Sequence, residues 1–514
     1  MTNEVYLDAN ATSPALPAAI AAAVDAMQER FGNPSSIHAA GLRARAVLDD
    51  ARAVAGRVIG AGEGDVVFTS GATEAIQTAV LSALCALRDR RAAGEAVGDL
   101  LIYGATEHKA IPECLAHWNR ILGTGFTIKA LAVDADGLHD LDDLKALAPR
   151  AALVCTMAAN NETGVVSDLA SIEAVLSEHA PRALWLVDCV QALGKLPLDL
   201  AASRIDYAPF SGHKLYAPKG IGMLYVRHDA PFTALMMGGG QERGLRSGTE
   251  NMAGIAAFGA VLHALENGQG FRGPQDLARL RDRLATALSH AFPGLLFNAP
   301  FARSLPTVLN FCVPGISSND LLKLFDAAGV RLSAGSACSA ARAAPSHVLC
   351  AMGLMDERAG SAVRLSFSPT ASDDFIDAAC ARIARCGAAL ARHAPPPVEP
   401  MAPSAALVDR GDADIHGAGL AAFLATYPDA RLIDVRGAFE HAAGAQNAWH
   451  GRAVENLPLS VFGSHIALCL ADPERPLLLF CRSGNRSLDA LRMLRAAGHP
   501  NVYHLAGGLA LQKG

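Results

Sequence analysis

The chain has 514 residues, of which 51% are hydrophobic, and a formal net charge of −6 at pH 7. This length exceeds one ordinary domain, so two or three domains are expected. The negative charge and the lack of a basic run argue against nucleic acid as a direct partner. The longest apolar run, residues 252–265, is too short to span a membrane.

The N-terminus has neither the basic segment nor the apolar segment of a signal peptide. The 11 cysteines form no CxxC pair and show no metal-ligand spacing. In a large chain, this pattern is typical of reduced thiols rather than disulfides. We therefore expect a cytoplasmic protein with no bound metal and no membrane contact.

Hydrophobic spacing predicts an amphipathic helix over residues 42–59, followed by short apolar runs that alternate with helical stretches. These runs lie at 66–69, 100–103, 153–156, 184–187, 207–210 and 222–226. The alternation predicts an α/β domain with a large, mostly parallel sheet over about 16–255. Longer helices with fewer strands over about 256–393 predict a small α+β lobe, which also includes the N-terminal segment.

A proline-rich stretch separates these 393 residues from the rest of the chain. Half of residues 395–404 are proline, which predicts a linker over 394–411. Strand-like runs at 432–435 and 477–480 then restart the strand–helix alternation. The sequence therefore predicts a further α/β domain over 412–514.

The stretch Ser211-Gly-His213-Lys214 follows the strand predicted at 207–210. A strand-end lysine beside a hydroxyl and an imidazole suits a phosphorylated aldehyde cofactor, pyridoxal 5′-phosphate (PLP). The amine can bond the aldehyde carbon, and the other two groups can meet the phosphate. A surface charge and a simple phosphate contact are the alternatives for this lysine.

Three other segments could complete such a site. Gly71-Ala72-Thr73 opens a helix after a strand, which suits a phosphate, although a plain helix cap is an equal alternative. Asp188 ends a buried strand and could pair with a protonated pyridine nitrogen, or cap the next turn. His108 could stack on a flat ring and move a proton, although a lone histidine is more often structural.

Nine ordered motifs resemble those of cysteine desulfurases of the NifS/IscS type, which are fold-type I PLP enzymes of the class V aminotransferase family. The resemblance covers about residues 4–390. The motifs are Tyr6-Leu-Asp8-Ala-Asn-Ala-Thr12, Gly32-Asn-Pro-Ser-Ser-Ile-His38, Ser70-Gly-Ala-Thr-Glu74, Glu107-His-Lys-Ala110, Asn160-Asn-Glu-Thr-Gly164, Val187-Asp188 with Gln191, Ser211-Gly-His-Lys214, Arg246-Ser-Gly-Thr249 and Gly335-Ser-Ala-Cys338-Ser-Ala340.

The resemblance implies a role for each matching residue. Lys214 would hold PLP through its amine and later move protons, with His108 stacked on the ring. Asp188 would hold the pyridine nitrogen and Gln191 the phenolic oxygen. The phosphate would be bound by Thr73, Ser211 and His213, with Thr249 reaching in from a second subunit, so a homodimer is expected. Ala72 and Asn161 would also contact the cofactor, and Asn161 and Arg364 would hold the substrate carboxylate.

Cys338 lies in a stretch of small residues, 332–341, that is predicted to be a loop. A cysteine in such surroundings is more often buried and inert. The resemblance implies instead that Cys338 is the nucleophile that accepts sulfur from L-cysteine as a persulfide, leaving L-alanine.

A second cysteine loop, Cys481-Arg482-Ser483-Gly484-Asn485-Arg486, follows the strand predicted at 477–480. Backbone N–H groups around the thiol, with the two arginines, would stabilise a thiolate or persulfide. A cysteine phosphatase would need an arginine six positions after the cysteine, where this chain has Ser487.

With Leu432-Ile-Asp434-Val-Arg436, Glu440 and Gly507-Gly508, residues 412–514 resemble a single-domain rhodanese. The resemblance implies that Cys481 carries sulfur. The tryptophan usual after the glycine pair is absent, and 444–455 is longer than common, which leaves substrate choice open. An inactive rhodanese kept for protein contacts is the alternative.

The resulting hypothesis is a PLP-dependent cysteine desulfurase in which Cys338 hands its sulfur to Cys481 for delivery to a protein or small thiol acceptor. A selenocysteine lyase or another PLP lyase is a second reading, and a non-catalytic sulfur-carrier or scaffold subunit is a third. The sequence does not identify the acceptor, and iron–sulfur cluster biogenesis is one pathway to which it could belong. The sequence also does not show whether the sulfur is transferred within one subunit or across a dimer.

Overall fold

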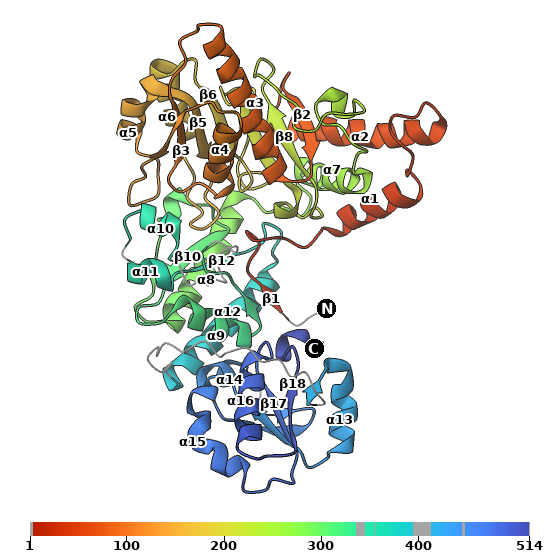
Figure 1. Ribbon diagram of the computed structural model, residues 1–514, viewed down its shortest axis with the longest axis vertical. Coiled ribbons are helices and arrows are strands. Elements are labelled where there is room, and N and C mark those ends of the chain that lie inside the picture. The colour runs from red at the N-terminus through yellow and green to blue at the C-terminus, as the bar shows by residue number, and fades with distance from the viewer. Residues whose placement is uncertain (1–3, 336–344, 355, 394–412, 445–447, 513–514) are drawn as a thin grey trace.

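The computed structural model describes residues 4–335, 345–354, 356–393, 413–444 and 448–512. In Figure 1 these residues form a large domain at the top, a smaller lobe in the middle and a C-terminal unit at the bottom. The segment predicted to be a linker, 394–411, and the predicted nucleophile Cys338 lie outside the described residues.

A seven-stranded sheet with the order β2-β8-β7-β6-β5-β3-β4 forms the centre of the large domain. Strand β8 runs antiparallel to both of its neighbours, and the other pairs are parallel. The strands are β2 (Asp65–Thr69), β3 (Leu100–Gly104), β4 (Thr127–Leu131), β5 (Ala151–Met157), β6 (Leu184–Asp188), β7 (Tyr207–Ser211) and β8 (Gly222–Val226). The predicted mostly parallel α/β sheet is therefore confirmed.

Helices cover both faces of this sheet, which explains why its strands read as unbroken apolar runs. In β6, Trp185 and Val187 face one hydrophobic core, whereas Leu184 and Leu186 face the other. The helices are α1 (Pro17–Gln28), α2 (Ala39–Val58), α3 (Ala72–Ala92), α4 (Ala110–Ile121), α5 (Leu141–Leu147), α6 (Leu169–His179) and α7 (Met252–Glu266).

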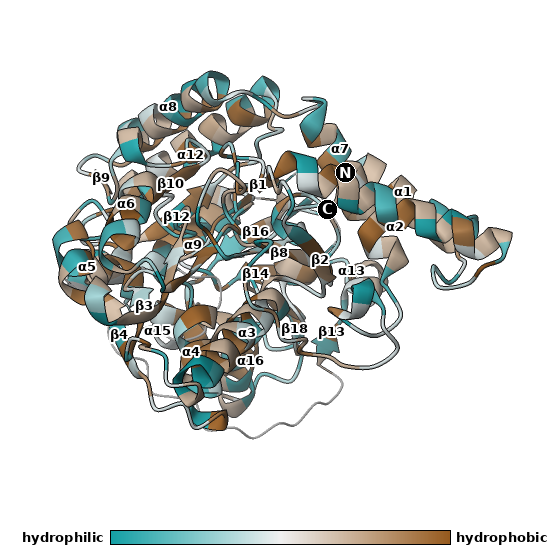
Figure 2. Ribbon diagram, turned by 90° about the horizontal axis from the view of Figure 1, so that it is seen from above, coloured by the Kyte–Doolittle hydropathy of each residue, from teal (hydrophilic) through white to brown (hydrophobic). Residues whose placement is uncertain are grey.

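Helices α1 and α2 project from the body of the domain as an arm (Figures 1 and 2). Several large hydrophobic side chains are exposed on α1, on α2 and on the segment between them. They are Ile20, Val24, Met27, Phe31, Ile37 and Leu42. An exposed group of this kind is typical of a surface that contacts another protein.

The small lobe is an α+β unit, as predicted. Its antiparallel sheet has the order β12-β10-β9, with β9 (Leu296–Phe297), β10 (Val308–Cys312) and β12 (Val363–Ser366). Its helices are α8 (Pro274–Ala291), α9 (Ser318–Ala327), α10 (His347–Ala351), α11 (Asp356–Ser361) and α12 (Asp373–Arg392). The N-terminal strand β1 (Val5–Tyr6) pairs with β11 (Val330–Arg331) in this lobe.

The C-terminal unit has a six-stranded sheet with the order β13-β18-β17-β14-β16-β15. The strands are β13 (Asp414–Ile415), β14 (Arg431–Asp434), β15 (Ala448–Trp449), β16 (Arg452–Asn456), β17 (Leu477–Phe480) and β18 (Val502–Leu505). The helices are α13 (Leu420–Thr426), α14 (Ala438–Gly444), α15 (Leu459–Cys469) and α16 (Asn485–Ala496). No helix within the described ranges is both long and apolar enough to cross a bilayer.

Helix α14 joins the C-terminal unit to the small lobe by packing against α9 and α12. Phe439 and Ala443 of α14 are buried in the hydrophobic core of the small lobe, not in the core of their own sheet. We call this the docking contact. It holds the C-terminal unit against the lobe by burial of apolar surface.

Replacing Phe439 with Ala should loosen the docking contact, because truncating a buried phenylalanine costs about 3–5 kcal/mol. Hydrogen exchange should then become faster in α9 and α14 but stay slow in β14 and β17. Phe462→Ala is the matched control, since Phe462 lies in the core of the C-terminal unit itself, so exchange should accelerate in β14 and β17. Unchanged protection of α9 and α14 in Phe439→Ala would contradict this assignment.

Candidate functional site

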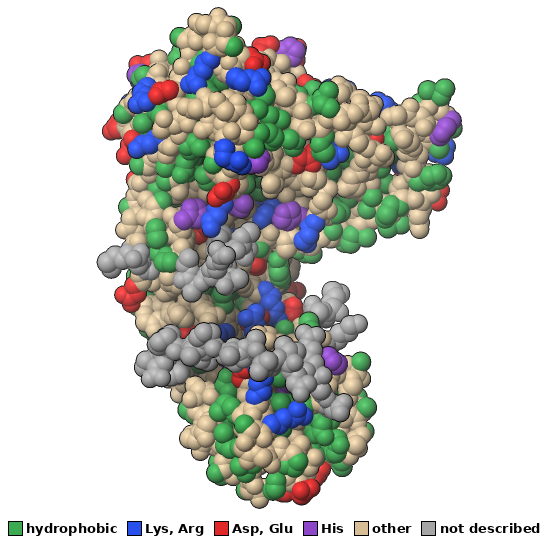
Figure 3. All heavy atoms as spheres, in the orientation of Figure 1, with side chains coloured by type: hydrophobic (Ala, Val, Ile, Leu, Met, Phe, Trp, Pro, Cys, Tyr) green, Lys and Arg blue, Asp and Glu red, His purple; other side chains and the backbone are tan. Residues whose placement is uncertain are grey.

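Lys214 lies just beyond the end of β7, in a short 3₁₀ turn at Gly212–Lys214. Its Nζ donates hydrogen bonds to the carbonyl oxygens of Asn10, at 2.6 Å, and Ala11, at 2.8 Å. The N-terminal segment therefore lies directly against the amine. Basic and histidine side chains gather at the level where the large domain meets the small lobe (Figure 3).

Asp188 lies at the carboxyl end of β6, close enough to Lys214 for the two charges to interact. Its Oδ1 accepts the N–H of Val190 at 2.9 Å. Burial raises the pKa of Asp188 to about 6, against the lowering effects of that hydrogen bond and the Lys214 charge. A buried carboxylate of this kind favours a nearby cation, so it fits the protonated pyridine nitrogen of PLP.

The start of helix α3 has the features of a phosphate site. The helix follows Gly71, which has φ 150°, and no side chain caps its first turn. The hydroxyl of Ser211 is 4.0 Å from the position that a Cβ on Gly71 would take. Ala72 and the exposed Thr73 lie in the first turn, so a hydroxyl and uncapped N–H groups converge at the positive end of a helix.

The two predicted histidines both favour the neutral form. His213 lies with Nδ1 3.1 Å from Thr12 Oγ1, and burial with the Lys214 and Lys219 charges lowers its pKa to about 4. His108 accepts the Ala110 N–H at Nδ1, at 3.2 Å, so its neutral ring has its proton on Nε2. Desolvation by surrounding atoms and the Lys214 charge lower the His108 pKa, although the residue is exposed to solvent.

Gln191 is fixed by a lysine to which sequence reasoning gave no role. Lys195 Nζ lies 2.6 Å from Gln191 Oε1 and 3.1 Å from Asn10 Oδ1. Burial and the charges of Lys214 and Arg364 lower the Lys195 pKa to about 7. Because Oε1 accepts from Lys195, the Gln191 amide N–H group remains the donor, here to the Asn10 carbonyl at 3.2 Å. A lysine four positions after Gln191, in an apolar stretch, was the available signal.

Arg364 is only 1% exposed, so it is a buried cation and not a surface charge. It donates to the Asn161 carbonyl at 3.0 Å and to Asp8 Oδ1 at 2.7 Å. Its Nε is buried with no hydrogen-bond partner among the described residues. The structure thus brings Arg364 and Asn161 together, and the unsatisfied donor is suited to an added carboxylate.

The described residues on either side of Cys338 meet the same turn as Asn161. Ser346 donates to Glu162 Oε2 at 2.6 Å, and a Cβ on Gly335 would lie 3.3 Å from that oxygen. Glu162 is buried and was not predicted as a site residue. Thr249 is exposed, beside Ser70 and Gly220 in a cavity of about 200 Å³.

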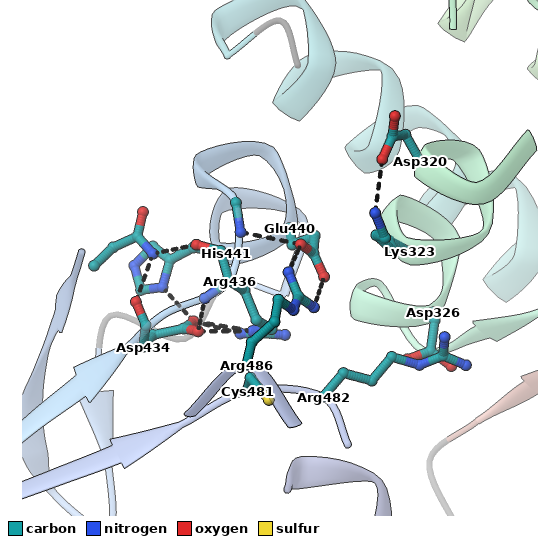
Figure 4. A network of polar contacts seen from close by, with 12 residues as sticks. Asp320, Lys323, Asp326, Asp434, Arg436, Glu440, His441, Cys481, Arg482 and Arg486 are labelled. Atoms are coloured by element: carbon teal, nitrogen blue, oxygen red, sulfur yellow. Dashed lines mark hydrogen bonds and ion pairs between the residues drawn. The ribbon is translucent and has the colours of Figure 1, made fainter. Parts of the chain in front are cut away.

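The Cys481 loop lies at the end of β17, with its thiol fully buried (Figure 4). Sγ accepts the N–H of Gly484 at 3.2 Å and lies 3.7 Å from Ser487 Oγ. Gly484 has φ 91°, and a Cβ there would come within 2.8 Å of the Gly507 nitrogen, so the turn requires glycine. Helix α16 begins at Asn485, directing its positive end at the thiol.

Both arginines of this loop are engaged by carboxylates (Figure 4). Arg486 makes two hydrogen bonds with the buried Glu440, at 2.6 and 2.9 Å. Arg482 makes an ion pair with Asp326 of α9, at 2.7 Å. The sequence predicted that these arginines would stabilise the thiolate, but their charges are largely compensated by Glu440 and Asp326. Ser483 and Asn485 are exposed.

Comparison with known proteins identifies both parts of the chain. The model of the aminotransferase class-V family matches residues 5–378, and that of the rhodanese-like domain matches residues 420–511. The chain therefore belongs to the class-V aminotransferases, which are PLP-dependent enzymes of fold type I, and ends in a rhodanese-like domain. The residues described above fit that cofactor.

Relatives narrow the likeness further. A cysteine desulfurase of Gluconacetobacter diazotrophicus is 38% identical over 377 residues, covering 73% of this chain and 91% of the relative. A solved NifS-like protein superposes with TM-score 0.66 at 31% identity, covering 74% of this chain and 98% of the other. The structure of SspA in complex with cysteine gives TM-score 0.59 at 28% identity, covering 71% and 99%.

No cluster of three metal-ligating side chains occurs within the described ranges.

Asp188→Asn should stabilise the cofactor-free protein at pH 8 but not at pH 4. A carboxyl whose folded pKa of about 6 exceeds its ordinary value of 3.8 opposes folding above pH 6, and this effect is absent below pH 3.8. The shift corresponds to roughly 2–3 kcal/mol in the free energy of unfolding. Urea unfolding at both pH values measures the difference.

The exposed carboxylate of Asp229 provides the control, since Asp229→Asn should show no such pH dependence. An equal effect of Asp188→Asn at pH 4 and pH 8 would contradict the buried-charge assignment. With PLP bound, Asp188→Asn should instead be less stable than the unmodified protein, because the mutant lacks the partner of the pyridine nitrogen.

Proposed function

We propose that the protein is a cysteine desulfurase that passes the sulfur of L-cysteine through a persulfide on Cys338 to Cys481 of its own rhodanese-like domain. The desulfurase relative and the cysteine-bound neighbour support the substrate. The observation that carries the relay is the ion pair between Arg482 and Asp326. It brings the Cys481 loop against the lobe whose chain leads to Cys338.

That chain is short and runs past the substrate side of the site. Helix α9, which contains Asp326, is followed by β11 and then by Ser333, which donates to Asp8 Oδ2 at 2.6 Å. Asp8 is also the ion-pair partner of Arg364. Gly335 is the last described residue before Cys338, which follows it by three positions in the sequence.

In the first half of the reaction, Arg364 and Asn161 hold the carboxylate of L-cysteine. Bound PLP supplies an electron sink that acidifies the Cα proton and weakens the Cβ–S bond. Lys214 takes the Cα proton and returns protons to the product, and the neutral His108 can donate the proton on its Nε2. The Cys338 thiolate attacks the substrate sulfur, so that an S–S bond forms as the Cβ–S bond breaks, and alanine leaves.

In the second half, the Cys481 thiolate attacks the outer sulfur of the Cys338 persulfide. One S–S bond forms, the other breaks, and Cys338 leaves as a thiolate. The Gly484 N–H and the start of α16 stabilise the charge on Cys481. A protein or small thiol then takes the sulfur by the same exchange.

A homodimer completes the proposal. The exposed apolar arm of α1 and α2 is a surface suited to a second copy of the chain. Thr249 is exposed, as a residue that reaches into a partner's phosphate site would be before association.

Two serine variants separate the halves of the relay. Cys338→Ser should keep the PLP absorbance but lower alanine formation by ~100-fold or more, because it lacks the nucleophile. Cys481→Ser should form alanine at the normal rate when a thiol reductant is supplied. Assays with ³⁵S-cysteine, followed by separation of the labelled peptides, measure both steps.

In the intact protein the label should appear first on Cys338 and then on Cys481. Labelling of Cys481 in Cys338→Ser at the rate of the unmodified protein would remove Cys338 from the route. Full alanine formation with no label on Cys481 would refute the relay but leave the desulfurase assignment in place.

A further inference from the structure

Arg482 is the one residue of the Cys481 loop whose described charge partner belongs to another domain. Its side chain is 45% exposed and extends across the docking contact to Asp326 (Figure 4). Asp326, in the last turn of α9, also accepts from Arg331 of its own lobe at 2.6 Å. The Asp326 carboxylate is therefore held by Arg331 of its own lobe and contacts Arg482 of the rhodanese-like domain.

Two further arginines of the Cys481 site, among the described residues, are held by carboxylates of the rhodanese-like domain itself. Arg486 is bound bidentately by Glu440, which is 1% exposed. Arg436 is bound by the fully buried Asp434. Breaking either of these buried pairs would leave a buried carboxylate without its arginine, which costs free energy. The partly exposed Arg482–Asp326 pair can exchange its carboxylate for another anion at little cost.

We propose that Asp326 is a specificity-determining residue of the rhodanese-like domain, which excludes small anionic sulfur donors such as thiosulfate from the Cys481 loop. Thiosulfate is a dianion, and an arginine at the mouth of the loop is the group that would bind it. Asp326 occupies that arginine in the docked protein. The loop is then reserved for a donor that brings sulfur without a sulfonate group, the persulfide of a cysteine.

The excluded reaction has a simple balance. The Cys481 thiolate would attack the outer sulfur of thiosulfate, the S–S bond of thiosulfate would break, and sulfite would leave with the bonding electrons. Cyanide would then take the outer sulfur of the Cys481 persulfide as thiocyanate and restore the thiolate. Arg482 takes part only in the binding of thiosulfate and not in the later steps. Asp326 therefore acts on the KM for thiosulfate more than on kcat.

Asp326→Asn in the full-length holoenzyme tests the proposal in a thiosulfate–cyanide assay. The KM for thiosulfate should fall about fivefold, as expected for release of a partly exposed ion pair, while kcat changes less than twofold. The gain should shrink at high salt, which screens the freed charge. With a thiol reductant supplied, so that turnover does not depend on transfer to Cys481, alanine formation from cysteine should be unchanged, which also shows that the variant is folded. Asp326→Ala should behave in the same way.

Two controls come from the same lobe. Asp320→Asn removes another α9 carboxylate, which pairs with Lys323 and not with the loop, so the KM should not move. Arg331→Gln removes the other partner of Asp326 and tests whether general loosening of the lobe changes the KM for thiosulfate. An unchanged KM in both Asp326 variants, or an equal fall in Arg331→Gln, would overturn the proposal.

The proposal rests on the proposed function for the identity of the internal donor, but the assay does not use that donor. If the unmodified protein showed no ³⁵S transfer from Cys338 to Cys481, the relay would be refuted while the thiosulfate result stood. An unchanged thiosulfate KM would refute the role of Asp326 while the relay stood. The two failures are therefore distinguishable.

Discussion

Charge compensation inside the PLP site is the constraint on which the rest of the large domain depends. Three cationic side chains, Lys195, Lys214 and Arg364, interact there through their charges, and Lys195 is buried deeply enough for its pKa to fall to about 7. Asp8 and Asp188 supply the negative charge. A phosphate and a substrate carboxylate would add the anions that these cations favour, so the site is electrostatically prepared for such ligands.

A second carboxyl group shows how the fold avoids too much negative charge. Burial and the charge of Asp188 raise the pKa of Glu107 well above its ordinary value, which favours the neutral form of Glu107. A neutral Glu107 adds no second negative charge beside Asp188. The strand order explains the arrangement, because the ends of β3, β6 and β7 bring Glu107, Asp188 and Lys214 to one edge of the sheet.

The sequence predicted the elements whose signal is local. Apolar runs marked the central strands, and ordered motifs marked the residues at their ends. Strand β4 was not predicted, since it lies at the sheet edge and alternates exposed and half-buried residues. Lys195 was missed although its spacing from Gln191 was a signal. Glu162 and Asp326 were missed for another reason, because both act through contacts between segments distant in the sequence or between domains, which neither spacing nor composition reports.

The docking contact changes what the rhodanese-like domain can use to stabilise sulfur. The two loop arginines appeared from the sequence to be the natural partners of a thiolate, yet Glu440 and Asp326 compensate them. The Gly484 N–H and the start of α16 therefore add backbone dipoles to the charge of Arg486, which Glu440 compensates but which still interacts with Cys481. These dipoles suit the negative charge of a thiolate. Because Asp326 compensates the partly exposed Arg482, the charge of that arginine is not available to a dianion in the docked protein, which agrees with the proposed donor, a cysteine persulfide.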